Sequence, residues 1–148
     1  MKKLYLIGSL RNEIIPQLSA RIREKLPEVE VFDDWYSAGP EADDFWKKYE
    51  QDKHGKDGQA YVRALAGYAA GHVFDFDKHH LDTATHSLLV LPAGKSGHME
   101  IMYAQYAAGA NTAILLEEGA DPRWDVMYKF IPNILTSFFE VEDWLDNG

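Results

Sequence analysis

The sequence predicts an α/β fold, in which a parallel sheet carries helices on both of its faces. Four short apolar runs, at residues 4–7, 29–32, 87–91 and 112–116, are typical of buried strands. Segments with helical spacing of apolar residues lie between these runs, and the connecting loops are rich in Gly, Pro and Asp. Strands that alternate with helices in this way form parallel sheets.

The helices are placed by their apolar spacing and by the residues that end them. Residues 14–26 form the first helix, which Pro27 ends, and a loop rich in Asp, Gly and Pro occupies residues 33–44. A surface loop is expected at residues 51–58. Further helices are expected at residues 44–50, 61–73, 77–85 and 99–108.

The C-terminal tail predicts a helix at residues 124–138, which Pro132 should kink or break. Residues 138–141 are then expected to form a last short strand, which gives a sheet of about five strands. The chain of 148 residues contains no repeat and no linker, so residues 1–148 are expected to form one domain.

Composition excludes several classes of function. The chain has no Cys, which excludes disulfides, a thiol nucleophile and a Cys-based zinc site. Its net charge of −9 argues against duplex nucleic acid as a partner, although a few local donors can still hold a small anion. No apolar run is long enough to span a bilayer, and the first strand follows Met1 too closely for a signal peptide. We therefore expect a cytoplasmic protein with no membrane partner.

The most informative segment is residues 88–100, where a buried strand runs into a Pro/Gly/Ser loop and then a helix whose first turn should contain Glu100. Ligands bind at the carboxyl ends of parallel strands, and a helix N-terminus favours an ionised carboxylate. Glu100 is therefore a candidate nucleophile. The alternative is an acid that only stabilises the helix dipole.

The loop after the first strand should meet this segment in space. Gly8 and Ser9 can bind an anion or a sugar through backbone N–H groups and a hydroxyl, and Arg11 adds a positive charge. The alternatives are a simple turn, with Asn12 capping the next helix, and a solvated Arg. Tyr5 is a core residue in the simplest interpretation, unless its hydroxyl reaches Glu100.

Asp77 can protonate a leaving group while Glu100 attacks, which is the division of work in glycosidic bond cleavage. Its alternative role is a helix N-cap. The His residues nearby match no standard zinc spacing, so no metal is expected. In the acidic-aromatic loop, Asp34 and Trp35 can bind and stack on a flat base, or Trp35 can close the edge of the core.

Together these segments resemble the nucleoside 2-deoxyribosyltransferase family, including its deoxynucleoside 5′-monophosphate N-glycosidases. The resemblance lies in residues 5–11, in residues 77–84 and in the strand, loop and helix that end at Glu100. It implies a flavodoxin-like or Rossmann-like sheet, a homodimer or higher homo-oligomer, and no metal or organic cofactor.

The resemblance also implies roles for individual residues. Glu100 would take the 2-deoxyribosyl group from the base, Tyr5 would orient Glu100, and Asp77 would assist the base. The sugar 5′ end or its phosphate would be held by Gly8, Ser9, Arg11, Gly94 and Ser96.

The chain departs from the family at two positions. Gly94 and Thr85 stand where many members have Asp. These departures support the alternative of a nucleotide-binding sensor or accessory module that has lost catalysis, and an enzyme acting on another N-glycoside remains a further alternative.

Overall fold

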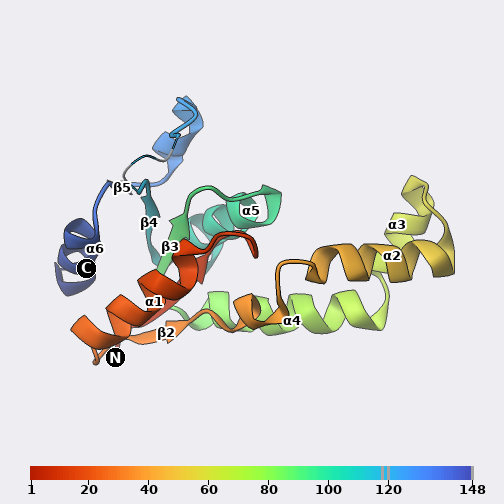
Figure 1. The fold of residues 1–148 in the computed structure, drawn as a ribbon, viewed down its shortest axis with the longest axis horizontal. Helices are drawn as coiled ribbons and strands as arrows, with labels where there is room; N and C mark the ends of the chain where they lie inside the picture. The colour runs from red at the N-terminus through yellow and green to blue at the C-terminus, as the bar shows by residue number, and fades with distance from the viewer. Residues whose placement is uncertain (118, 120, 148) are drawn as a thin grey trace.

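The computed structural model describes residues 1–117, 119 and 121–147, and its centre is a five-stranded parallel sheet with the order β2-β1-β3-β4-β5 (Figure 1). The predicted α/β class is confirmed. The strands are β1 (Lys3–Ile7), β2 (Glu30–Phe32), β3 (His86–Val90), β4 (Asn111–Leu115) and β5 (Asn133–Leu135).

Six α-helices and three shorter helical turns connect the strands within the described residues. The α-helices are α1 (Ile14–Lys25), α2 (Ala42–His54), α3 (Gly58–Leu65), α4 (Tyr68–Thr83), α5 (Lys95–Tyr103) and α6 (Phe138–Asn147). The short turns are η1 (Asp34–Ala38), η2 (Ala104–Ala108) and η3 (Val126–Phe130). None of the helices in the described ranges is both long and apolar enough to cross a bilayer.

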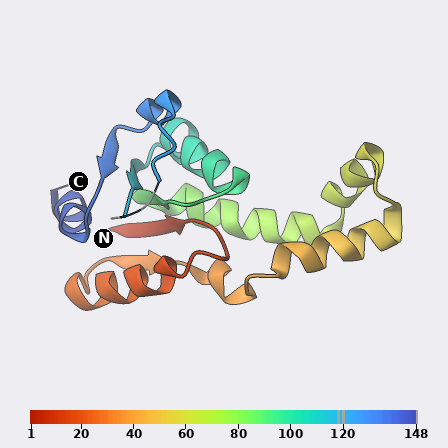
Figure 2. The same cartoon turned by 45° about the horizontal axis from the view of Figure 1, so that its top comes forward.

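Helices cover both faces of the sheet (Figure 2), and a hydrophobic layer on each face holds the fold together. Alternate residues of β1 supply both layers, since Leu4 and Leu6 pack with α1 and α6 while Tyr5 and Ile7 pack with α4 and α5. All five residues of β3 are buried. A central parallel strand is covered on both faces, which explains the continuous apolar run at residues 88–91 of the sequence.

The structure corrects the predicted helices between β2 and β3. The helix expected at residues 44–50 continues to His54, where a surface loop was predicted. The helices expected at residues 61–73 and 77–85 are wrongly divided, because the chain breaks earlier, at Gly67, and α4 then runs unbroken to Thr83. No Gly or Pro separates residues 73–77, so nothing there ends a helix.

The predicted tail is also wrong. Residues 124–138 form the short turn η3 and the edge strand β5 in place of one helix, and residues 138–141 begin α6 in place of a strand. Pro132 lies directly before β5, where its missing N–H costs little. Phe138, Val141 and Trp144 recur at helical spacing and are buried against the sheet.

Residues 42–76, which we call the helical arm, extend away from the sheet (Figures 1 and 2). The arm comprises α2, α3 and the N-terminal half of α4, and its chain runs outward along α2 and returns along α4. The C-terminal half of α4 packs on the sheet through Leu81. One continuous helix therefore belongs to both parts of the molecule.

Candidate active site

The candidate site lies at the carboxyl ends of β1 and β3, the two strands from which the strand order proceeds in opposite directions. Such a switch point is where open α/β sheets bind ligands. The two loops that follow these strands are joined, because Asn12 Nδ2 donates to the Pro92 carbonyl at 3.4 Å. The expectation that these loops meet in space is confirmed.

Tyr5 and Glu100 are in direct contact at this switch point. The Tyr5 hydroxyl donates a hydrogen bond to Glu100 Oε2 at 2.8 Å, and the Tyr5 side chain is buried in the middle of β1. Glu100 lies in the second turn of α5, so the prediction of the first turn is wrong. The helix already begins at Lys95, after the N-cap residue Gly94.

Close packing of α5 on the sheet brings these two side chains together. Gly97 faces the sheet, and a Cβ at that position would lie 3.1 Å from Leu89 Cδ1 and 3.2 Å from Ile7 Cγ2. Because Gly97 has no side chain, the helix approaches β1 and β3 closely enough for Glu100 to reach Tyr5.

Asp77 approaches the same point from α4. It lies in the third turn of that helix and is partly buried, so the alternative that it caps the helix is wrong. Its negative charge raises the pKa of both Tyr5 and Glu100, which places the Asp77 carboxylate near the pair. Tyr5 and Glu100 are thus in direct contact, and Asp77 acts on both of them through its charge.

Burial dominates the electrostatics of this cluster. Loss of solvation raises the pKa of Glu100 to about 7, with the charge of Asp77 adding to the rise and the Tyr5 hydrogen bond opposing it. The prediction that a helix N-terminus keeps Glu100 ionised is therefore wrong. Burial also raises the pKa of Asp77 to about 6. Burial and the two carboxylates raise the pKa of Tyr5, which stays a neutral donor.

The loop after β1 holds the predicted anion-binding residues in a tight turn. Gly8 is packed so closely that a Cβ would lie 2.8 Å from Ile15 Cδ1. Ser9 Oγ accepts a hydrogen bond from the Arg11 N–H at 3.1 Å. The Arg11 guanidinium forms an exposed ion pair with Asp44 of α2 at 2.9 Å, so Arg11 connects this loop to the helical arm.

The acidic-aromatic loop, which contains Asp34 and Trp35, is arranged differently from a surface on which a flat base stacks. Trp35 Nε1 donates to the Leu6 carbonyl at 2.8 Å, and the ring packs against both hydrophobic layers, so its contacts are those of a residue that closes the edge of the core. Asp34 is exposed at the start of η1. The ring of Phe32 lies beside Tyr5, with the two centroids 4.9 Å apart.

Gly94 and Ser96 lie at the N-terminus of α5, as expected, whereas their neighbour His98 was not predicted as a site residue. His98 Nδ1 is 2.7 Å from the Gly94 carbonyl, and Nε2 is 3.0 Å from the Tyr128 hydroxyl. Asn12, which the sequence predicts only as a helix cap, is buried between the two loops. A polar residue directly after the turn at residues 8–11 was the available signal.

Within residues 1–117, 119 and 121–147, no three His, Asp or Glu side chains are grouped closely enough to hold a metal ion. The site itself brings together two carboxyl groups with raised pKa values and a phenol that donates to one of them.

Comparison with known proteins supports the fold. The chain is similar to a solved structure of a conserved protein from Enterococcus faecalis V583, with a TM-score of 0.65 and 15% sequence identity over 99% of this chain and 98% of that one. No protein-family model and no curated protein matches the chain. At this identity the likeness extends to the fold, a flavodoxin-like or Rossmann-like parallel sheet with helices on both faces.

Proposed function

We propose that this protein cleaves the N-glycosidic bond of 2′-deoxynucleosides or their 5′-monophosphates, with Glu100 as the nucleophile. The observation that carries the proposal is the hydrogen bond from Tyr5 to Glu100, with Asp77 beside the pair at the β1/β3 switch point. The resemblance of these segments to the nucleoside 2-deoxyribosyltransferases suggests the substrate class.

In the first step, a Glu100 carboxylate oxygen bonds to C1′ of the sugar while the bond from C1′ to the base nitrogen breaks. The electron pair of that bond leaves with the base, and the Asp77 carboxyl donates its proton to the base. Tyr5 donates to Glu100 Oε2, so it fixes the carboxylate and leaves Oε1 free to attack. In the second step, water or another base bonds to C1′ while the bond from C1′ to Glu100 breaks, and the Asp77 carboxylate takes the proton that the water or base loses.

The raised pKa values of Glu100 and Asp77 determine where the proton of this pair resides. Glu100 and Asp77 titrate as a pair that holds one proton between about pH 6 and 7. Glu100 has the higher pKa, so the shared proton resides mainly on Glu100, and catalysis uses the minority form in which Asp77 holds the proton and Glu100 carries the negative charge.

The substrate's 5′ end is proposed to lie against Gly8, Ser9 and the N-terminus of α5, where Gly94 and Ser96 are found. Backbone N–H groups at a helix N-terminus favour an anion, so a phosphate fits there. Arg11 is close in sequence to this loop and would exchange its exposed ion pair with Asp44 for the phosphate.

The proposal is tested by incubating the purified protein with the four deoxynucleosides and their 5′-monophosphates, with and without a second free base. Released base is measured by chromatography. Release without an acceptor indicates a hydrolase, and exchange that requires the acceptor indicates a transferase. Tight nucleotide binding without release of base from any substrate would contradict the proposal and favour the sensor.

A further inference from the structure

Asp77 belongs to a helix that continues far beyond the sheet, so its position depends on the contacts that hold α4 at the sheet end. Asp77, His80 and Leu81 lie on one face of α4, because residues three and four apart on a helix are neighbours. Leu81 is buried in the hydrophobic layer on that side of the sheet. His80 is therefore the polar neighbour of Asp77 on the face of α4 that packs on the sheet.

A row of packed rings joins His80 to the candidate site. The His80 ring is stacked on Phe32 of β2, with centroids 3.9 Å apart and an angle of 14° between the ring planes. Phe76, one turn earlier on α4, meets the His80 ring edge-on at 4.8 Å. Phe32 in turn lies beside Tyr5, which donates to Glu100. The row therefore connects α4, through β2, to the Tyr5–Glu100 pair.

Lys3 of β1 makes the second contact that holds His80. Lys3 Nζ lies 2.8 Å from His80 Nδ1, and it donates to Thr83 Oγ1 at 2.8 Å. An ammonium group can only donate, so Nδ1 accepts and the neutral ring has its hydrogen on Nε2. A second hydrogen, on Nδ1, would face the ammonium group and break the contact. Neutral His80 therefore ties the C-terminal half of α4 to β1.

The charges around His80 favour this neutral form. Loss of solvation, the Lys3 ammonium group and His79 lower the pKa of His80, and the charges of Asp34 and Glu30 oppose them. The net result is a pKa below the ordinary value of 6.5, so the ring is neutral at about pH 7. The contact between Lys3 and His80 is therefore made under ordinary conditions.

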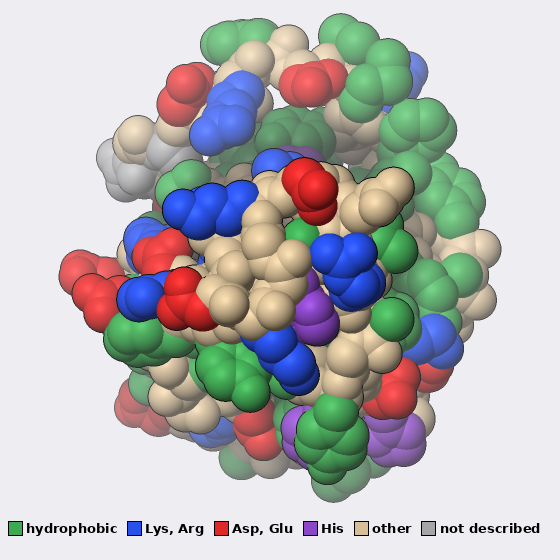
Figure 3. Space-filling view, turned by 90° about the vertical axis from the view of Figure 1, so that its right-hand side faces the viewer, with side chains coloured by type: hydrophobic (Ala, Val, Ile, Leu, Met, Phe, Trp, Pro, Cys, Tyr) green, Lys and Arg blue, Asp and Glu red, His purple; other side chains and the backbone are tan. Residues whose placement is uncertain are grey.

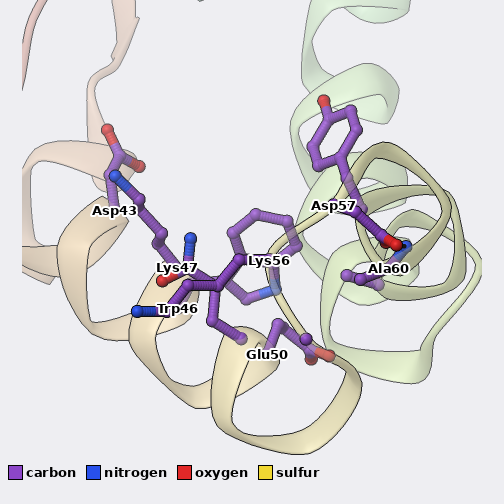
Figure 4. A pocket seen from close by; sticks show the side chains of 11 residues that line it. Asp43, Trp46, Lys47, Glu50, Lys56, Asp57 and Ala60 are labelled. Carbon is purple, nitrogen blue, oxygen red and sulfur yellow. Dashed lines mark hydrogen bonds between the residues drawn. The ribbon is translucent and has the colours of Figure 1, made fainter.

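The outer part of α4 has no comparable anchor. In residues 42–76, all of which the structure describes, the only buried side chains are Glu50, Ala60 and Ala64. A cavity of about 420 Å³ lies between α2 and α3, lined by Trp46 among others (Figure 4). In Figure 3, which faces the outer end of the arm, hydrophobic side chains lie exposed among charged ones. The contacts at the sheet therefore have to fix α4.

We propose that His80 is a positioning residue, whose ring stack and contact with Lys3 hold Asp77 in place. His80 and Asp77 are less than one helical turn apart, so they move together. When the His80 contacts are lost, the helix can turn or lift, and the Asp77 carboxyl group moves away from Glu100. The consequence for catalysis rests on the proposed function, whereas the position of Asp77 can be measured without it.

The first test measures the pKa of Glu100 by NMR of its carbon-13-labelled carboxyl group, with Glu100→Gln identifying the signal. The charge of Asp77 raises this pKa, so displacement of Asp77 should lower it. His80→Phe keeps an aromatic ring and removes the acceptor for Lys3, and it should lower the pKa of Glu100, as Asp77→Asn does. The matched control is His72→Phe, the same exchange at an exposed position of α4, which should leave the pKa of Glu100 unchanged.

The second test asks whether the contact with Lys3 is what holds His80. Lys3→Met should lower the pKa of Glu100 as His80→Phe does, and the double variant should lower it no further, because both changes break the same contact. Additive effects of the two changes overturn the proposal. An unchanged pKa of Glu100 in His80→Phe, or an equal fall in His72→Phe, also overturns it.

Steady-state kinetics extend the test to the reaction. His80→Phe should lower kcat about tenfold with little change in KM, since the contacts with the substrate remain and only the acid is displaced. A fall in kcat without a fall in the pKa of Glu100 overturns the positioning role. A native protein that releases no base contradicts the proposed function alone, and the NMR measurement then still decides whether His80 positions Asp77.

Discussion

The sheet and the helical arm differ in how many of their apolar side chains are buried within the chain. Every residue of β3 is buried within the chain, whereas the arm buries little more than Ala60 and Ala64 and leaves its aromatic rings in solvent. The sheet can therefore be rigid in a single chain, while the arm depends on what covers it. Two of the three site residues, Tyr5 and Glu100, belong to the rigid part.

The third, Asp77, lies where the two regions meet. It follows Phe76, the last residue of the arm, and precedes Leu81, which packs on the sheet. Because α4 is continuous, a movement of the arm would move Asp77 relative to Glu100. Tyr5 and Glu100 therefore set the chemistry, and Asp77 can adjust it when the arm moves.

The largest expected effect comes from exchanging one carboxyl group in each region. Glu100→Gln should lower turnover by at least about 10³-fold, since the nucleophile is lost. Glu50→Gln, which alters a carboxyl group that is buried in the arm, should leave turnover unchanged. Steady-state kinetics on both variants check this, and an equal loss in both would show that the reaction is not localised at the sheet.

Glu100→Gln should also stabilise the fold at alkaline pH. The folded-state pKa of Glu100 is raised from 4.5 to about 7, so the folded state binds more protons than the unfolded state and stability falls as pH rises through this range. At about pH 8 the neutral variant should gain on the order of 3 kcal/mol in unfolding free energy. Denaturant titrations at about pH 4 and 8 measure this gain, which should vanish at the lower pH.

Truncation of a leucine in each region compares their packing directly. Leu89→Ala in β3 should cost about 3 kcal/mol of unfolding free energy, because it leaves a cavity beside α5. Leu65→Ala in α3 should cost less than about 1 kcal/mol in dilute protein, because that side chain is half exposed. Similar losses in urea titrations would mean that the arm is packed in the monomer.

Tyr5→Phe should lower kcat by about 10- to 100-fold with little change in KM. The variant removes the hydrogen bond that lowers the pKa of Glu100, so the pH profile of kcat/KM should also shift upward. Tyr103→Phe is the matched control, because that hydroxyl donates to Asp82. An unshifted profile in Tyr5→Phe would leave Tyr5 a packing residue only.

The pH profile itself should be bell-shaped, with its maximum between about pH 6 and 7. Below this range both carboxyl groups are protonated and there is no nucleophile. Above it both are ionised and there is no acid. Asp77→Asn should remove the alkaline limb, and a native profile that is flat from about pH 5 to 8 would contradict the pairing of these groups.

The smallest effects are expected at Arg11, where the two regions touch. Arg11→Ala should change the unfolding free energy by less than about 0.5 kcal/mol, since its ion pair with Asp44 is exposed. It should raise KM about tenfold for monophosphates and leave KM for nucleosides unchanged. Equal changes for both substrates would remove Arg11 from the phosphate subsite.

The sequence predicted the sheet better than the tail and the arm. Four strands were found because a short, continuous apolar run that polar, Gly or Pro residues interrupt on both sides is typical of a strand buried in a parallel sheet. The fifth, β5, is a three-residue edge strand, too short to show a pattern of its own. The arm has no one-sided apolar pattern matched to a core within the chain, so its helix boundaries were misplaced.

Residue type and topology were enough to predict which side chains form the site. They were not enough to predict the pKa values of those side chains. That Tyr5 and Glu100 meet follows from adjacent parallel strands and the loop after β3. The raised pKa of Glu100 depends on how closely Gly97 brings α5 to the sheet, which a sequence does not display. The hydrogen bond that Trp35 donates to the Leu6 carbonyl likewise depends on three-dimensional packing, which the sequence does not display.

The lengths of the outer strands have a consequence for how the protein avoids aggregation. The sheet ends in β2 on one side and β5 on the other, and each has only three residues. Such short borders offer an incoming chain few free backbone N–H and C=O groups, so growth of the sheet from molecule to molecule is disfavoured. The helical arm can therefore expose apolar side chains while the edges of the sheet still resist the growth of fibres.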